Sequence, residues 1–410
     1  MPESKTRQWK YVFTIVFAII LCCSLNNPFC DTVQATELRG DISLEGFLFF
    51  SDGAWDDQEK QSVSMAANIE IYHEFLSNLT FTLTGFYRQD SQDNKRSHGD
   101  LRLAELLYYT DNYELTAGFG RVFWGATEFV HLVNIINQTD QVDALDGEEK
   151  LGQPMIHLTV PYDWGVIEAF ALPWFRERTF AGTNGRFRPP LPVNRDKTKY
   201  ESSSEAQHLD IACRVSTNLA NADIGFSYFR GTARDPALLA ARDSKNNLYL
   251  FPYYQQIDQT GLDIQLIAGE WLLKAEAYYR SGQSRSYLAT TLGFEYTFTG
   301  IVDTMIDVGL IGEYVFDDRD DGWLPTVYEN DIMGGVRLTV NDMADSSLLF
   351  GIIRDLDNGS TIIALEASRR IGDAVRLNLE SSFFLDMDYH DPAFAMAKDD
   401  FIKLELVYYW

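Results

Sequence analysis

Two stretches of opposite charge hold the side chains most able to act on a solute. Within residues 125–152, six carboxylates stand against one lysine, Lys150; they are Glu128, Asp140, Asp143, Asp146, Glu148 and Glu149. Within residues 176–199, seven basic residues stand against Glu177 and Asp196; they are Arg176, Arg178, Arg186, Arg188, Arg195, Lys197 and Lys199. Arginine binds carboxylate and phosphate through paired donors, so the second stretch could attract anions. Opposite charges at one opening would create a field that orients dipolar solutes.

Residues suited to catalysis or metal binding do not fall into a recognised spacing. The six histidines do not pair at metal-ligand spacing, and the sequence has no G-x-S-x-G, H-E-x-x-H or Walker-type motif. The acidic run at 317–322 offers the oxygens that calcium prefers, but it lacks the spacing of an EF-hand loop. The sequence therefore predicts no enzyme activity, no cofactor and no metal site.

The N-terminal composition indicates export. Three basic residues precede an apolar run at 11–23, and small residues at 33–35 offer a cleavage point. This order predicts a secretory signal peptide over residues 1–35, since the apolar run is shorter than the roughly 20 residues that span a membrane. The rest of the chain keeps only Cys213, so no disulfide framework is expected. A net charge of −26 argues against a nucleic-acid partner.

Hydrophobic alternation with a period of two runs through residues 36–410. In residues 79–88, for example, Leu79, Phe81 and Leu83 oppose the threonines that follow each of them. Segments of about ten residues with this alternation, separated by turn residues, are typical of a transmembrane β-barrel. A soluble β-sandwich is the alternative, but it does not explain strand ends rich in Tyr, Phe and Trp.

The connections between these segments alternate between short turns and longer polar loops. Turns such as 372–373 alternate with loops near 124–152 and 176–205. In outer-membrane barrels the short turns face the periplasm and the long loops face outward. The segments predict a single all-β domain over 36–410, an antiparallel barrel of about 18 strands. Sixteen strands remain an alternative, because residues 248–256 could extend a strand or belong to a loop.

The final segment is expected to close this barrel. In "LELVYYW" at 404–410, Leu404, Leu406, Tyr408 and Trp410 share one face. Pairing this strand with the first one, expected at 41–50, would leave no open edge, and an open edge in a bilayer leaves backbone groups unsatisfied. The segment resembles the C-terminal signal strand that the barrel assembly machinery reads in bacterial outer-membrane proteins.

Longer motifs resemble a largely uncharacterised group of porin-like proteins of the Gram-negative outer membrane. They are "FWGATEFVHLVNIINQTDQ" at 123–141, "LGQPM" at 151–155, "GFEYTF" at 293–298 and "GEYVFDDR" at 312–319. The resemblance implies an integral outer-membrane location, contact with lipid and lipopolysaccharide, and passage of small solutes. It also makes the acidic stretch the candidate for the third porin loop, which folds inward as the constriction. It implies neither a particular solute nor an oligomeric state.

If the apolar strand faces contact lipid, the opposite faces line the interior. The ionisable residues expected there include Glu70, Arg88, Asp210, Arg214, Lys274, Glu276, Arg280, Arg337, Arg376 and Glu380. Side chains of both signs suit a water-filled channel, and they equally suit structural ion pairs in the wall. Apolar residues at helical spacing within 128–137 predict a short helical segment packed against that wall.

We therefore expect a passive channel for small hydrophilic solutes, with anions favoured if the basic stretch faces the pore. The alternative is a closed barrel whose inward loops fill the interior and which serves adhesion, lipopolysaccharide contact or assembly. Under that alternative the acidic stretch could be an outward cap, and the basic stretch could bind lipopolysaccharide phosphates.

Overall fold

The computed structural model describes residues 36–410 except 145, 284, 320–323 and 325. The predicted signal peptide lies outside the described residues, as do residues 320–322 of the acidic run at 317–322. Among the described residues, no helix is long and apolar enough to cross a membrane.

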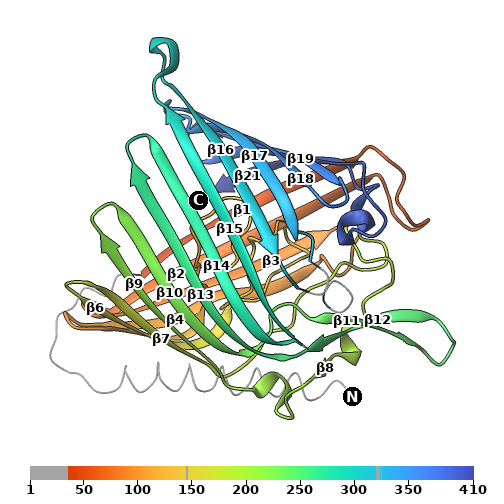
Figure 1. Ribbon diagram of the computed structural model, residues 1–410, viewed down its shortest axis with the longest axis horizontal. Coiled ribbons are helices and arrows are strands. Elements are labelled where there is room, and N and C mark those ends of the chain that lie inside the picture. The colour runs from red at the N-terminus through yellow and green to blue at the C-terminus, as the bar shows by residue number, and fades with distance from the viewer. Residues whose placement is uncertain (1–35, 145, 284, 320–323, 325) are drawn as a thin grey trace.

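Eighteen strands form one antiparallel sheet that closes on itself (Figure 1). They are β1 (Thr36–Phe49), β2 (Gln61–Leu76), β3 (Leu79–Asp90), β4 (His98–Tyr109), β5 (Glu114–Gly120), β6 (Gln153–Tyr162), β7 (Gly165–Leu172), β9 (Asp210–Leu219), β10 (Ala222–Thr232), β13 (Gln256–Ala268), β14 (Trp271–Gln283), β15 (Arg285–Phe298), β16 (Ile306–Asp317), β17 (Asn330–Val340), β18 (Ser346–Asp355), β19 (Thr361–Ile371), β20 (Val375–Leu385) and β21 (Phe401–Tyr409). Each strand pairs with the next in chain order, and β21 pairs with β1. The structure confirms the predicted antiparallel barrel of about 18 strands.

A second, three-stranded sheet lies at the end of the barrel that carries the long loops. It consists of β8 (Lys199–Tyr200), β11 (Ala237–Arg242) and β12 (Leu248–Tyr254), and the β11–β12 hairpin projects beyond the barrel wall (Figure 1). The sequence pattern did not decide whether residues 248–256 extend a strand or belong to a loop. In the structure they form β12 and the start of β13. The remaining elements are short 3₁₀ turns, η1 (Arg195–Lys197), η2 (Glu205–Gln207), η3 (Ile301–Asp303) and η4 (Pro392–Met396).

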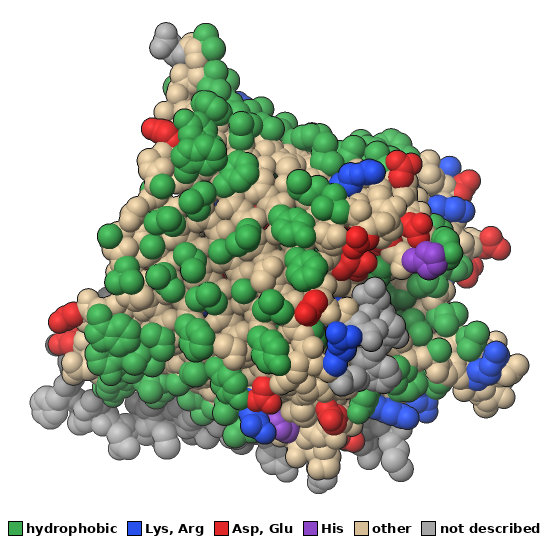
Figure 2. Space-filling model, in the orientation of Figure 1, with side chains coloured by type: hydrophobic (Ala, Val, Ile, Leu, Met, Phe, Trp, Pro, Cys, Tyr) green, Lys and Arg blue, Asp and Glu red, His purple; other side chains and the backbone are tan. Residues whose placement is uncertain are grey.

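The outer face of the barrel is apolar and the inner face is polar. On β1, Leu44 is 55% exposed while its neighbour Glu45 is only 2% exposed. Figure 2 shows apolar side chains spread over the strands, with charged side chains collected mainly toward the long-loop end. An apolar surface of this extent is stable in contact with lipid rather than water.

The barrel closes where Trp410 meets Gly40. The two residues exchange backbone hydrogen bonds of 3.0 and 3.2 Å. A Cβ added to Gly40 would lie 2.8 Å from Cζ2 of Trp410 and 2.5 Å from the backbone oxygen of Asn68. The first strand begins at Thr36 rather than at the predicted residue 41, because residues 36–40 continue the pairing with β2.

This contact gives a test of closure. We expect Gly40→Leu to lower the free energy of unfolding by about 1–3 kcal/mol, because the added side chain must displace backbone or the indole. Gly46→Leu is the matched control, since a Cβ at this position of the same face and strand meets no atom within 4 Å. Thermal unfolding in detergent micelles measures the difference. Equal melting temperatures for the two variants would contradict the prediction.

Candidate permeation pathway

The loop between β5 and β6, residues 121–152, folds into the barrel and crosses it; we call it the inner loop. The backbone N–H of Thr127 donates to the Glu276 carboxylate on β14 at 3.0 Å. The backbone N–H of Glu128 donates to the Glu313 carboxylate on β16 at 2.6 Å. These strands lie across the barrel from β5, so the inner loop divides the interior.

The carboxylates of Glu276 and Glu313 on the barrel wall also explain why the inner loop is not helical. Phe129 donates its backbone N–H to Glu313 at 3.1 Å, and Val133 donates to Glu276 at 3.1 Å. Hydrogen bonds to an ionised acceptor are stronger than those between neutral amides, so these N–H groups are satisfied without helix carbonyls. The helix predicted within 128–137 is therefore wrong, because this segment contains only turns and bends.

One side of the inner loop packs against the wall as a hydrophobic core inside the barrel. The loop contributes Trp124, Val133, Ile135 and Ile136, and the wall contributes Met155, Phe170, Leu172, Ala212, Phe229 and Ile257. The ring of Phe129 lies over two glycines of β17 and β18. A Cβ added to Gly335 or Gly351 would lie 3.2 or 3.1 Å from that ring. Buried apolar area of this kind holds the loop against the wall.

The other side of the inner loop is held by ion pairs. Arg102 on β4 contacts Asp140 at 2.9 Å and Asp143 at 2.7 Å. Arg88 on β3 contacts Asp143 at 2.9 Å and Glu45 at 3.0 Å. All five side chains are at most 7% exposed. Such pairs fix geometry, because breaking one leaves an uncompensated buried charge.

Asp140 stays ionised well into the acid range. Burial alone would raise its pKa, but the hydrogen bond from His98 and the charges of His98 and Arg102 hold the pKa at about 2. Because this value lies below that of an ordinary carboxyl, Asp140 adds stability that is fully present above about pH 4 and is lost as the pH falls toward 2. The attachment of the inner loop should therefore persist in mild acid.

The loop between β7 and β9, residues 173–209, reaches across the long-loop end; we call it the outer loop. Its basic residues are largely engaged by acidic residues from other segments. Arg176 contacts Asp100 at 2.5 Å, and Arg178 contacts Asp235 at 2.6 Å. Burial would raise the pKa of Asp235, but the charges of Arg178 and Arg280 lower it overall.

The farther part of the outer loop is anchored near β1 and β21. Arg186 donates to Asp399 at 2.6 Å, and the guanidinium of Arg188 lies 3.6 Å from the ring centroid of Trp55. Arg195 contacts Glu177 within the loop at 3.4 Å. Lys199 lies 5.0 Å above the ring of Phe251, and Lys197 is exposed. These contacts therefore neutralise much of the positive charge that was expected to create an electric field at the opening.

The Arg186 anchor gives a second test. We expect Arg186→Leu to expose the outer loop to trypsin, because Asp399 would keep a buried charge without its partner, at a local cost of about 3–5 kcal/mol. Arg195→Leu is the control, since its ion pair is half exposed and worth little. Cleavage within 176–199 on reconstituted protein measures the effect. Equal cleavage rates for both variants would show that Arg186 does not hold the loop.

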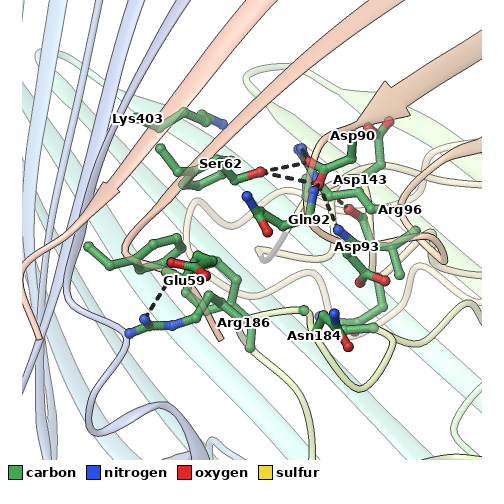
Figure 3. A pocket seen from close by; sticks show the side chains of 18 of the residues that line it. Glu59, Ser62, Asp90, Gln92, Asp93, Arg96, Asp143, Asn184, Arg186 and Lys403 are labelled. Atoms are coloured by element: carbon green, nitrogen blue, oxygen red, sulfur yellow. Dashed lines mark hydrogen bonds and ion pairs between the residues drawn. The ribbon is translucent and has the colours of Figure 1, made fainter. Parts of the chain in front are cut away.

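Two cavities lie on either side of the inner loop and both are bordered by Asp143. The smaller, about 60 Å³, is drawn in Figure 3, with Asp90, Arg96 and Asp143 on one side and Asn184 and Arg186 of the outer loop on the other. The larger, about 680 Å³, opens toward the short-turn end; its lining includes Arg39, Glu70, Arg121, Glu149 and Glu405. The inner loop therefore separates an outer and an inner vestibule.

Two solved structures share this arrangement of strands. A BenF-like porin from Pseudomonas fluorescens Pf-5 superposes with a TM-score of 0.53 at 9% identity, over 92% of this chain and 98% of that one. OccD3 (OpdP) from Pseudomonas aeruginosa superposes with a TM-score of 0.51 at 9% identity, over 91% and 90%. The chain has the porin fold. No protein-family model and no curated protein matches the sequence.

This porin-type barrel places the ionisable residues expected inside it on inward-facing strand positions, but in two environments. Some are covered by loops; they are Arg88, Asp210, Lys274, Glu276 and Arg280, each at most 8% exposed. The others lie at half-buried positions; they are Glu70, Arg214, Arg337, Arg376 and Glu380. Of the acidic stretch, Glu128 pairs with Arg337 and Lys274, and Asp140 and Asp143 are held by arginines. Glu148 lies 3.8 Å from His131, Glu149 lies 3.5 Å from Arg121, and Asp146 is exposed.

Sequence reasoning missed Arg102, which binds the inner loop. The pairing of β3 with β4 shifts register between Thr84 and Gly85, so Arg102 leaves the simple alternation. It also missed Asp399, whose partner Arg186 is distant in the chain. For Arg102 the available signal was an arginine within an otherwise alternating strand. For Asp399 the sequence offered no signal.

Proposed function

We propose that this porin-type barrel is a passive channel of the bacterial outer membrane for small hydrophilic solutes. The observation that carries the proposal is the pair of vestibules that border one inner loop inside a closed barrel. An apolar outer face places the barrel in lipid, and a polar interior lets water and solutes remain solvated. Solutes would diffuse down their gradient, with the inner loop as the narrowest point.

We do not extend the proposal to a preference for anions. That expectation rested on the basic stretch, and Arg176, Arg178 and Arg186 of this stretch are paired with carboxylates. An arginine whose N–H donors already bind a carboxylate has few donors free to bind an anion in the pore. Reading of residues 404–410 by the assembly machinery, and contact with lipopolysaccharide, remain part of the proposal.

A second candidate function is a closed barrel that serves binding or structure. The position of the outer loop favours a closed barrel. Arg186 and Asp399 anchor this loop across the long-loop end, where it could cover the opening. Planar-bilayer recording of the refolded protein separates the two. Stepwise conductance is the result expected of a channel. A barrel that is folded by gel mobility but gives no steps would overturn the channel and favour the closed barrel.

The proposed channel should become less permeable to cations, relative to anions, in mild acid. Partial desolvation inside the barrel and the charges of Glu148 and Glu380 raise the pKa of Asp146, while the backbone N–H of Glu148 and the charge of Lys403 oppose this. Asp146 therefore takes up a proton at a higher pH than an ordinary carboxyl, and one negative charge leaves the narrow region. We expect the K⁺/Cl⁻ permeability ratio to fall as the pH drops below neutral. Asp146→Asn should flatten this part of the reversal-potential profile, and an unchanged profile would contradict the assignment.

A further inference from the structure

We infer that Thr179 of the outer loop is a positioning residue for the inner loop, so that a displacement of the outer loop also moves the narrowest point of the channel. This role rests on the proposed function, because the inner loop narrows the proposed channel. Three features of the structure support it. They are a buried contact between the two loops, anchors on both sides of that contact, and open space around the segment that it holds.

The hydroxyl of Thr179 joins the two loops directly. It donates to the carboxylate of Asp140 at 2.7 Å, and it accepts the backbone N–H of Val142 at 3.2 Å. Thr179 is 8% exposed, Val142 is 7% exposed and Asp140 is fully buried. A buried N–H without an acceptor costs more free energy than an ordinary hydrogen bond gains. This one hydroxyl therefore helps to fix where residues 140–142 lie.

The outer loop is anchored on both sides of Thr179. Arg176 binds Asp100 of β4 on one side, and Arg186 binds Asp399 on the other. The side chains of the two aspartates are 1% and 2% exposed. Each arginine is held in place, because its departure would leave an uncompensated buried charge. Thr179 thus holds the inner loop from a segment that is itself fixed at both ends.

The segment between Thr179 and Arg186 lies close against the loop that connects β3 to β4. The backbone N–H of Gly182 donates to the carboxylate of Asp93 at 2.9 Å. A Cβ added to Gly182 or Gly185 would lie 2.5 or 2.3 Å from an oxygen of this carboxylate. The backbone can approach Asp93 this closely only because glycine occupies both positions, so a shift at Arg186 is transmitted along a closely fitted segment.

The part of the inner loop that Thr179 holds has room to move. Residues 141–144 border the smaller cavity, with the outer loop on its other side, and Asp143 borders the larger cavity as well. By contrast, Val133 and Ile136 are fully buried in the hydrophobic core. Closely packed residues stay in place without polar contacts, whereas residues beside open space depend on them.

The barrel wall contributes separate contacts to the same segment. Arg102 binds Asp140 and Asp143, and Arg96 donates to the backbone carbonyl of Val142 at 3.0 Å. These contacts remain when the Thr179 hydroxyl is lost, so residues 140–144 should loosen without leaving the wall. A molecule that displaces the outer loop from outside would loosen the inner loop in the same way.

Hydrogen exchange measured by mass spectrometry tests the contact in the folded protein. In Thr179→Val, the amides of residues 140–144 should exchange about tenfold faster, because the variant lacks the hydroxyl that holds them. Thr179→Ser keeps a hydroxyl and should exchange as wild type does. Peptides from β13 and β14 should be unchanged in both variants, which controls for global unfolding. Equal exchange at 140–144 in Thr179→Val and wild type would overturn the inference.

Transmission through the outer loop is tested with Arg186→Leu. This variant releases the far anchor and should also speed exchange at residues 140–144, although it leaves the Thr179 hydroxyl intact. Its effect should be smaller in a Thr179→Val background, because the direct contact between the loops is already lost. Faster exchange at residues 180–188 without any change at 140–144 would show that the outer loop does not control the inner loop.

Planar-bilayer recording separates this role from the proposed function. Thr179→Val should give brief current excursions about tenfold more often than wild type, at the same main conductance, and Thr179→Ser should not. Conductance steps with the wild-type rate of excursions in Thr179→Val would overturn the inference and leave the channel standing. Faster exchange in a barrel that gives no steps would overturn the channel, while the contact between the two loops would stand.

Discussion

Replacement of Glu276 by alanine is expected to release the inner loop and widen the channel. The carboxylate accepts hydrogen bonds from the backbone of Ala126, Thr127 and Val133 and from the Thr127 hydroxyl, at 2.6 to 3.1 Å. Without it, buried N–H groups lose their acceptor at about 1–3 kcal/mol each. A total of about 3 kcal/mol shifts the ratio of attached to released loop by about a hundredfold.

Single-channel conductance measures this release. The variant should show larger and noisier openings than wild type, because the loop no longer narrows the pore. Glu276→Gln is the graded comparison, since its amide oxygen still accepts hydrogen bonds but carries no charge, and it should give a smaller change. Conductance and noise equal to wild type in Glu276→Ala would show that the other contacts hold the loop without Glu276; they are the hydrophobic packing, the hydrogen bonds to Glu313 and the ion pairs of Arg102.

Replacement of Arg102 by methionine is expected to destabilise the barrel strongly at neutral pH. The guanidinium lies 2.7 to 3.6 Å from Asp143, Asp140 and Asp100, which are 7%, 0% and 1% exposed. Methionine fills similar space without charge, so the three carboxylates lose their shared cation. Loss of one partner of a buried pair costs about 3–5 kcal/mol. Urea unfolding of protein in micelles measures the free energy of unfolding.

The pH dependence distinguishes a lost charge from lost packing. In Arg102→Met the carboxyl of Asp140 keeps His98 but loses Arg102, so its pKa should rise from about 2. The variant should then recover part of the lost stability as the pH falls and the carboxylates take up protons. Glu45 and Arg88 remain paired nearby in this variant. A deficit that is the same at pH 7 and pH 4 would assign the effect to packing instead.

Much of the fold could be predicted from local pattern. The alternation of Leu44 and Glu45, for example, indicates which face of the strand contacts lipid. Each strand has one face toward the bilayer and one toward the interior, so its own sequence carries this pattern. The same rule predicted that β21 pairs with β1. It fails where the inner loop packs, since Phe170, Phe229 and Ile257 point inward and yet are apolar. There the wall is buried on its inner face as well, and the period-two pattern weakens.

The candidate site could be predicted only in part. The acidic stretch was the candidate for the loop that folds inward only through the resemblance to porin-like proteins, and that resemblance depends on local motifs such as residues 123–141. Its contacts are not local: Glu128 pairs with Arg337, and Arg186 pairs with Asp399, each more than two hundred residues away. Such pairing depends on the closed barrel bringing distant strands together, so no single segment encodes it. The environment of Arg102 depends on a register shift that composition does not reveal.

The unequal filling of the barrel gives it a stiff half and a compliant half. From β6 to β16 many inward-facing side chains are covered by the packed inner loop, whereas several inward-facing side chains on β19 and β20 stay half-buried or exposed. A deformation of the surrounding bilayer, such as a mismatch in thickness, is absorbed where the resistance is lowest. We therefore expect strain from the membrane to act mainly on the wall formed by β19 and β20. The width of the proposed channel should then depend on the lipid composition of the membrane.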